Sequence, residues 1–229
     1  MAKKKKVIKK HKIKFLSIFI LLLIFFLVYF LIKGILSFRI QNIYIHNTET
    51  LNDEYILELA KIEDYPSYVK NSSWILEKRL VESPYIKSAE VKKSFLGVID
   101  IYIEEASVLY YKEYDKKYVL DNGEEVDSLI YNFSPVRVIN YIPDVVYERF
   151  YKKVLAFDND IIDKISQIKY DPSEYDDSRF LFYMIDGNYV YMTISKFETL
   201  NYYNQIYPTL NGKKGTLYLD SGNHFQEFK

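Results

Sequence analysis

The chain has 229 residues, no cysteine, three histidines and a formal net charge of +0. Residues 1–14 hold eight lysines and no acidic residue, which leaves 23 basic against 31 acidic side chains in the remainder. An acidic body argues against nucleic acid as a partner, because phosphate contacts need a positive surface. The lack of cysteine excludes disulfides, so the folded part must be stabilised by its core alone.

Residues 15–32 form an uncharged apolar run, FLSIFILLLIFFLVYFLI, that spans roughly 27 Å as a helix, close to the thickness of a bilayer core. A cleaved signal peptide would have a shorter apolar region and small residues at a cleavage site, whereas Lys33 to Phe38 shows no such pattern. We therefore predict a basic cytoplasmic tail over 1–14 and a retained transmembrane helix over 15–33. The lysines place the N-terminus inside, and they attract anionic membrane lipids.

The next 70 residues alternate between strand and helix signals. Residues 38–46 read as a strand, and a capping pattern at Thr50 precedes a helix over 52–62. A second helix fits 73–82, with Ser73 as its cap, and Pro84 terminates it. We expect the apolar face of this second helix to consist of Trp74, Leu76, Leu80 and Val81.

A hairpin follows between Pro84 and Val108. Ala89 and Val91 share one face of its first strand, and Ile99, Ile101 and Ile103 share one face of the second. These apolar faces should cover the two helices, completing a strand-helix-helix-strand-strand domain over 38–107. We expect Lys92, Lys93 and Glu104 on the opposite, exposed face.

The remaining chain predicts a mixed α/β domain over 108–220 and a C-terminal tail over 221–229. Turns at Gly123 and Gly187 indicate two hairpins. Further elements are expected as strands over 135–140, 165–170 and 216–220 and helices over 144–155 and 196–210. The overall class is therefore α+β, with one transmembrane helix before two external domains.

This order of elements resembles the bacterial cell-division family FtsQ/DivIB. The first external domain resembles its POTRA domain, through Pro84, Ile86, Ala89, Val91, Lys92 and Lys93, then Ile101, Ile103 and Glu104. The second resembles its β domain, through Tyr118-Val119-Leu120-Asp121, Met184-Ile185-Asp186-Gly187 and Gly215-Thr216-Leu217-Tyr218-Leu219-Asp220. The chain departs from the family pattern at Glu105, where a basic residue is usual, and at Ser107, where proline is usual.

The residues supply no recognisable catalytic or metal-binding constellation. His46 and His224 lie 178 positions apart with no cysteine, which is unlike a zinc site. No nucleophile motif or glycine-rich phosphate loop is present, and Asp121-Asn122-Gly123 reads as a turn rather than a calcium loop. We expect no enzymatic activity, no metal and no cofactor.

The resemblance implies a divisome scaffold at the division septum that binds small coiled-coil proteins of the FtsB/DivIC and FtsL type, and through them influences septal peptidoglycan synthesis. A strand edge can accept a strand from a partner, and the last predicted strand offers such an edge. The resemblance to the family implies that the residues contacting the partner are Thr216, Tyr218, Asp220 and Phe225. Two alternatives remain open at this stage, a POTRA-type chaperone or secretion-assembly component and an anchored cell-wall enzyme.

Overall fold

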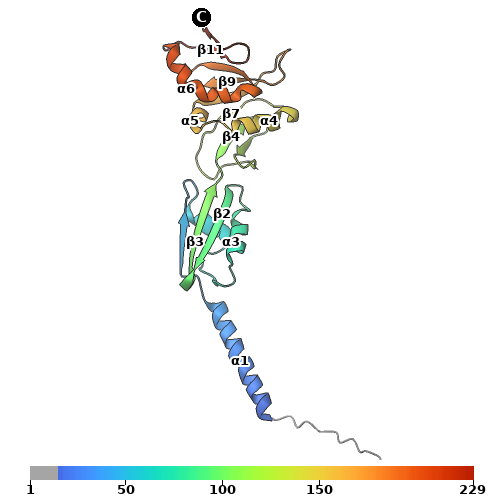
Figure 1. Ribbon diagram of the computed structural model, residues 1–229, viewed down its shortest axis with the longest axis vertical. Coiled ribbons are helices and arrows are strands. Elements are labelled where there is room, and N and C mark those ends of the chain that lie inside the picture. The colour runs from blue at the N-terminus through green and yellow to red at the C-terminus, as the bar shows by residue number, and fades with distance from the viewer. Residues whose placement is uncertain (1–14) are drawn as a thin grey trace, which may run out of the picture. The chain divides into compact units, whose positions relative to one another are not determined.

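The computed structural model describes residues 15–229, so the predicted basic tail lies outside the described residues (Figure 1). The described chain divides into two compact units. The first contains residues up to His46, with Asp53–Leu80 and Glu90–Tyr102, and the second contains Asn47–Asn52, Val81–Ala89 and Ile103–Lys229. Both units have α+β architecture, as the sequence predicts.

Helix α1, Phe15–Ser37, is the apolar segment predicted from the sequence. Its 23 residues have a mean hydropathy of 3.2 over the most apolar window, and all of them are exposed. The helix continues four residues beyond the predicted end at residue 33, and Ser37 Oγ donates to the Lys33 carbonyl at 2.7 Å. Among the described residues, α1 is the one helix long and apolar enough to cross a membrane.

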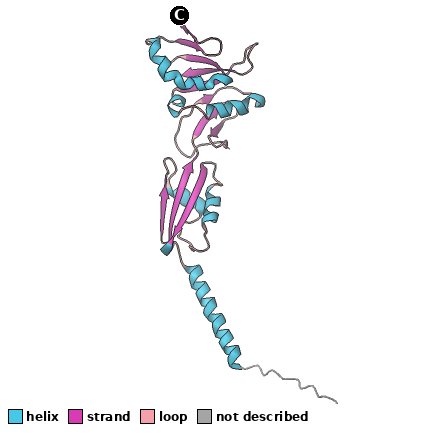
Figure 2. Cartoon of the chain, viewed as in Figure 1, coloured by secondary structure: helices cyan, strands magenta, loops and turns pink. Residues whose placement is uncertain are grey.

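A three-stranded sheet follows, with helices on one face, as Figure 2 shows. Its strands are β1 (Asn42–His46), β2 (Ile86–Ser94) and β3 (Val98–Glu105), in the order β1-β3-β2, with β1 parallel to β3. Its helices are α2 (Asp53–Ala60) and α3 (Ser73–Leu80). The predicted strand-helix-helix-strand-strand order is confirmed. The division between the two units passes through the β2–β3 hairpin, so a domain boundary at residue 107 stays a prediction.

The buried faces of this region follow the predicted alternation, with one exception in α3. Leu76 and Leu80 are fully buried, but Trp74 is 68% exposed and Val81 is 46% exposed. The predicted apolar face was wrong for these two residues. Trp74 lies about 200° around the helix from Leu76, on the side away from the core. Val81 follows the last residue of α3, so it does not continue the buried stripe.

The second sheet has nine strands in the order β12-β11-β10-β9-β8-β7-β4-β5-β6. Its strands are β4 (Val108–Lys112), β5 (Lys117–Leu120), β6 (Glu125–Val126), β7 (Arg137–Val138), β8 (Ile165–Tyr170), β9 (Arg179–Met184), β10 (Tyr189–Thr193), β11 (Gly215–Tyr218) and β12 (His224–Glu227). Its helical segments are α4 (Asp144–Val154), α5 (Asn159–Ile162), η2 (Ile194–Tyr202), α6 (Tyr203–Ile206) and η3 (Tyr207–Leu210).

An aromatic cluster forms the centre of the second unit's core. The Phe180 ring stacks on the Phe150 ring at 5.0 Å, and the Phe197 ring meets Phe180 and Phe182 edge-on at 5.4 and 5.0 Å. These contacts join helix α4, η2 and strand β9, and each aromatic pair contributes on the order of 1 kcal/mol beyond its area burial. This core supports the strands that lead to the C-terminal edge of the sheet.

Four elements differ from the sequence prediction. Strands β4 and β12 and the short helix α5 were not predicted, and the helix expected over 196–210 is divided into two 3-10 segments on either side of α6. Residues 224–227, predicted as part of a tail, therefore belong to the sheet.

Candidate docking edge at the C-terminal strands

Strand β11 lies inside the sheet, not at its edge. On one side it pairs in parallel with β10, where Thr216 lies opposite Tyr189 and Leu217 opposite Val190. On the other side it pairs antiparallel with β12, where Leu217 lies opposite Phe225. The expectation that residues 216–220 form an open edge is therefore wrong, because the following turn returns the chain as β12. The open edge of the sheet at this end is β12.

Gly215 allows β12 to approach β11 closely. A Cβ placed on Gly215 would lie 2.6 Å from the Phe225 ring atom Cζ and closer still to the Gln226 carbonyl oxygen. The three nearest atoms to that position all belong to β12. Any side chain at residue 215 would push β12 away from β11.

Buried Asn188 fixes the start of β11. Its side-chain oxygen accepts the Gly215 N–H at 2.9 Å, and its amide group donates to the Tyr203 hydroxyl at 3.3 Å. The Tyr203 hydroxyl in turn donates to Asp186 Oδ2 at 2.7 Å. Burial and the neighbouring Asp186 raise the pKa of Tyr203, so the hydroxyl keeps its proton and remains a donor. The β9–β10 turn thus determines where β11 begins.

A row of stacked side chains crosses four strands at this end of the sheet. The Arg179 guanidinium lies 3.7 Å from the Tyr191 ring centre, Tyr191 stacks on Tyr218 at 5.5 Å, and Tyr218 stacks on His224 at 4.6 Å. Stacked cross-strand pairs of this kind stabilise the register of neighbouring strands. The row ends at His224 on the open edge.

Asp220 is held by an ion pair at the end of β11. Arg179 Nε donates to Asp220 Oδ2 at 2.7 Å, and Lys196 Nζ donates to the Leu219 and Asp220 carbonyls at 3.0 and 3.1 Å. Burial raises the pKa of Asp220, but the hydrogen bonds from Arg179 and Ser221 outweigh it and hold the pKa below its ordinary value. Asp220 is therefore ionised and already paired within the chain.

The four predicted contact residues occupy different environments. Thr216 is buried, and Tyr218 is partly buried between Tyr191 and His224. Asp220 is engaged with Arg179, and Phe225 packs against the hydrophobic core. The structure brings all four to the β11–β12 hairpin, but their side chains chiefly hold that hairpin in place. The groups that β12 itself exposes are His224, Gln226 and Glu227.

Of the three residues predicted on the exposed face of the β2–β3 hairpin, Lys92 and Glu104 are exposed and Lys93 is not. Lys92 is exposed with Nζ 4.6 Å from the Tyr102 ring centre, and Glu104 is exposed and accepts a hydrogen bond from Ser88 Oγ at 2.8 Å. Lys93 differs, because its ammonium group donates to the carbonyls of Tyr68 and Asn71, the latter at 2.9 Å. The placement of Lys93 beside Lys92 on the exposed face was wrong, since successive strand residues point to opposite faces.

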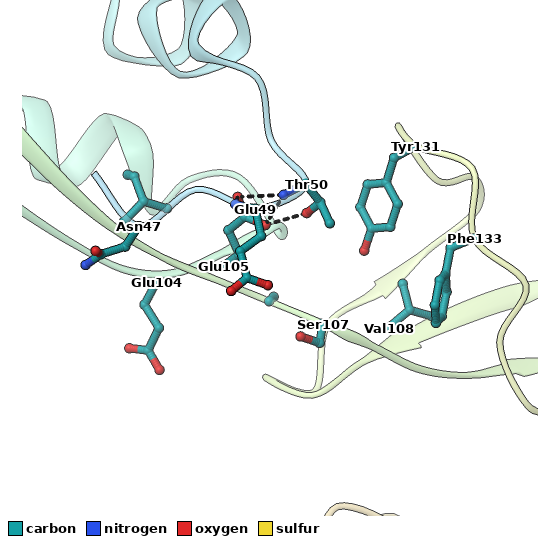
Figure 3. A pocket seen from close by; sticks show the side chains of 11 residues that line it. Asn47, Glu49, Thr50, Glu104, Glu105, Ser107, Val108, Tyr131 and Phe133 are labelled. Carbon is teal, nitrogen blue, oxygen red and sulfur yellow. Dashed lines mark hydrogen bonds between the residues drawn. The ribbon is translucent and has the colours of Figure 1, made fainter. Parts of the chain in front are cut away.

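Glu105 explains one departure from the family pattern. Its carboxylate accepts the backbone N–H groups of Glu49, Thr50 and Leu51 at 2.9, 3.0 and 3.0 Å, and also the Thr50 hydroxyl. Figure 3 shows Glu105 beside Glu49 and Thr50. Burial raises its pKa, but these hydrogen bonds outweigh burial and lower it. A basic side chain could accept none of these bonds. Glu105 thus fixes the segment before α2.

Glu105 borders a pocket of about 530 Å³ that Figure 3 shows from close by. The aromatic rings of Tyr131 and Phe133 lie on one side of it, and Ser107 lies between them and Glu105. The Glu105 carboxylate is occupied by backbone donors, which suits a structural anion better than a catalytic acid. Within residues 15–229 no group of three or more His, Cys, Asp or Glu side chains is placed to hold a metal ion.

Comparison with known families and proteins gives a consistent result. Residues 38–106 match the family of POTRA domains of FtsQ type. The chain is 28% identical over 200 residues to the cell division protein DivIB of Bacillus subtilis (strain 168), covering 83% of this chain and 74% of that protein. It is 30% identical over 233 residues to the cell division protein DivIB of Bacillus anthracis, covering 98% of this chain and 86% of that protein.

Among solved structures, the chain is similar to the major extracytoplasmic domain of the trans isomer of the bacterial cell division protein DivIB from Geobacillus stearothermophilus. The match has a TM-score of 0.37 and 20% sequence identity, and it covers 47% of this chain and 96% of that one.

Proposed function

The chain belongs to the DivIB family of bacterial cell-division proteins, and we propose that it acts in division as a non-enzymatic scaffold that binds small coiled-coil division proteins. The partners we propose are the DivIC (FtsB-like) and FtsL-like proteins. Through them the scaffold helps to control the septal peptidoglycan synthase complex, which it does not itself need to contact.

The observation that carries this proposal is the open edge of β12. An edge strand presents unpaired backbone N–H and C=O groups that a partner strand can pair with, which supplies affinity. The side chains of His224 and Gln226 would then supply selectivity, because they are exposed on that strand. Thr216, Tyr218, Asp220 and Phe225 contribute by holding the β11–β12 hairpin in the geometry that a partner strand meets.

We further propose that α1 is a single membrane span, with the N-terminus cytoplasmic and the folded units outside the cell membrane, at the division septum. The length and apolar character of α1 support a span, and the lysine run of residues 1–14 supports the orientation. Anchoring in one membrane confines scaffold and partners to a common plane, which raises their effective concentration.

We also propose Lys92 and Glu104 as further contact residues, because each side chain is exposed on its own strand of the β2–β3 hairpin. A POTRA-bearing chaperone or secretion component would also present such residues. That alternative predicts binding to many unfolded client peptides instead of one coiled-coil pair, so a binding assay with unrelated unfolded peptides separates the two. An assay of the full chain on peptidoglycan tests the proposed lack of enzymatic activity.

A truncation tests the β12 proposal. A chain that ends at Asp220 lacks β12 but keeps β11 and the Arg179–Asp220 ion pair. We expect this chain to insert in the membrane and to lose co-purification with the DivIC-type and FtsL-type pair. A chain that ends at Phe228, which retains all of β12, is the matched control and should co-purify. Equal recovery of the pair by both chains would contradict the proposal.

A further inference from the structure

The turn between β2 and β3 exposes two large apolar side chains. Phe95 is 89% exposed and Leu96 is 68% exposed, and both lie in the short 3-10 segment η1, Phe95–Gly97. Adjacent apolar residues at a hairpin tip make little contact with the core of their own domain. Their exposure in water is unfavourable, and burial in a second apolar environment would relieve it.

The backbone of this turn also disfavours leucine. Leu96 has a φ of 70°, in the left-handed region where a Cβ is strained and where glycine or asparagine is usual. An asparagine at this position would suit both the backbone and the aqueous surface better. The sequence instead places a branched apolar side chain there and directs it outward.

Hydrogen bonds attach the turn to the segment that directly follows α1. Gln41 N donates to the Gly97 carbonyl at 2.9 Å, and a Cβ on Gly97 would lie 3.2 Å from the Phe38 ring. The Tyr68 hydroxyl donates to the Ser94 carbonyl at 2.7 Å, which fixes the other side of the turn.

The same segment is tied to the last residues of the helix. Ser67 Oγ donates to the Leu36 carbonyl at 2.6 Å, and Tyr68 N donates to the Phe38 carbonyl at 2.8 Å. The rings of Phe38 and Tyr68 meet edge-on at 5.8 Å. The turn, residues 36–41 and residues 67–68 therefore form one connected structure at the end of α1.

The length of α1 places this structure at the membrane surface. Its 23 residues extend about 35 Å, which exceeds the roughly 30 Å of a bilayer core, so the last turn reaches the headgroup region. Gln41, which bonds the turn, is four residues beyond the helix and thus at most about 14 Å along the chain from it. Tyrosine side chains such as Tyr68 are enriched at this depth, and phenylalanine and leucine are among the apolar residues that bury at the headgroup–acyl boundary.

We propose that Phe95 and Leu96 insert into the headgroup–acyl boundary of the leaflet from which α1 emerges. This inference rests on the proposed assignment of α1 as the membrane span. The lipid surface is the occupant that the structure favours, because the turn is hydrogen-bonded to the segment that follows α1 and because exposed Arg39, whose carbonyl oxygen lies 3.1 Å from a Cβ placed on Gly97, suits a phosphate headgroup. Two attachments, helix and tip, fix the tilt of the three-stranded sheet on the membrane.

Single-cysteine labelling tests this proposal in the full chain, which has no cysteine of its own. The variants Phe95→Cys and Leu96→Cys would each be labelled with an environment-sensitive dye and placed in lipid nanodiscs that hold one chain each. The nanodisc lipids would carry a quencher near the top of the acyl chain. Ser37→Cys, at the end of α1, gives the reference level of quenching. Glu90→Cys is the matched control, since it is exposed and lies about 13 Å along β2 from Ser94.

We expect quenching at residues 95 and 96 to match that at residue 37 and to exceed that at residue 90 several-fold. Quenching at 95 and 96 no greater than at 90, with 37 quenched, would overturn the tip insertion and leave the span intact. Absence of quenching at 37 as well would overturn the membrane assignment of α1 and this inference with it. A dye signal that changes only in discs with two chains would assign the tip to a second copy and overturn the proposal.

Discussion

Arg179 and Asp220 are joined at 2.7 Å between Arg179 Nε and Asp220 Oδ2, although 41 positions separate them. Arg179 begins β9 and Asp220 follows β11, so the ion pair reaches past the intervening strand β10. The same guanidinium lies over the Tyr191 ring of β10. One side chain therefore fixes the end of β11 and, with it, the turn into β12.

The Arg179–Asp220 pair should contribute to stability. Their side chains are 19% and 12% exposed, so Arg179→Met would leave a largely buried carboxylate without its cationic partner. We expect a loss of about 3 kcal/mol, which corresponds to a fall in Tm of about 6–12 °C. Thermal unfolding of the full chain in detergent, followed by circular dichroism, measures this. Lys152→Met removes an exposed i,i+4 pair and should leave Tm unchanged. An equal Tm for both variants would contradict the role given to Arg179.

The carboxylate of Glu105 should make stability depend on pH. The pKa of Glu105 in the folded state lies below its ordinary value of 4.5. The stabilisation that Glu105 gives the folded state is therefore full at neutral pH, and it is lost as the pH falls below 4.5 and through the folded-state pKa. Glu105→Gln should destabilise the protein by about 2 kcal/mol at pH 7, because hydrogen bonds to a charged acceptor are lost. The difference in Tm between the wild type and the variant should shrink as the pH falls below 4.5. A difference independent of pH would show that ionised Glu105 is not the stabilising species.

Gly215 offers a way to displace β12 while leaving its sequence intact. Gly215→Ala would place a Cβ against the Gln226 carbonyl and the Phe225 ring, so β12 should separate from β11. We expect affinity for the coiled-coil partners to fall at least about tenfold, a loss of about 1.4 kcal/mol. Gly212→Asn is the control, because that position has a positive φ that asparagine tolerates and nothing within 4 Å of its Cβ. Equal partner affinity in the two variants would contradict a docking role for β12.

The two folded regions differ in how far their sequence predicts their structure. The β2–β3 hairpin is half-exposed, so its apolar residues Ile99, Ile101 and Ile103 alternate with polar ones and the faces are predictable. Strand β4 has buried residues on both faces, including Leu109 and Tyr110, and therefore shows no period of two.

The predicted single helix over 196–210 was wrong because the spacing of its apolar residues also fits a 3-10 helix. Phe197, Leu200 and Tyr203 recur every three residues, which is the period of a 3-10 helix, and Pro208 limits regular hydrogen bonding further along. Strand β12 is short and exposed, so its four residues resemble a tail until the close approach at Gly215 is known. The edge strand of the sheet is therefore β12, one strand later than the sequence predicts.

Amide hydrogen exchange in the full chain, with and without the DivIC-type and FtsL-type pair, tests the central claim most directly. If a partner strand pairs with the open edge, exchange of the β12 amides His224–Glu227 should slow markedly when the pair is bound. The amides of β6, Glu125–Val126, at the opposite end of the same sheet, should be unaffected. Unchanged exchange in β12 at saturating partner concentration would contradict the claim that this strand is the docking edge.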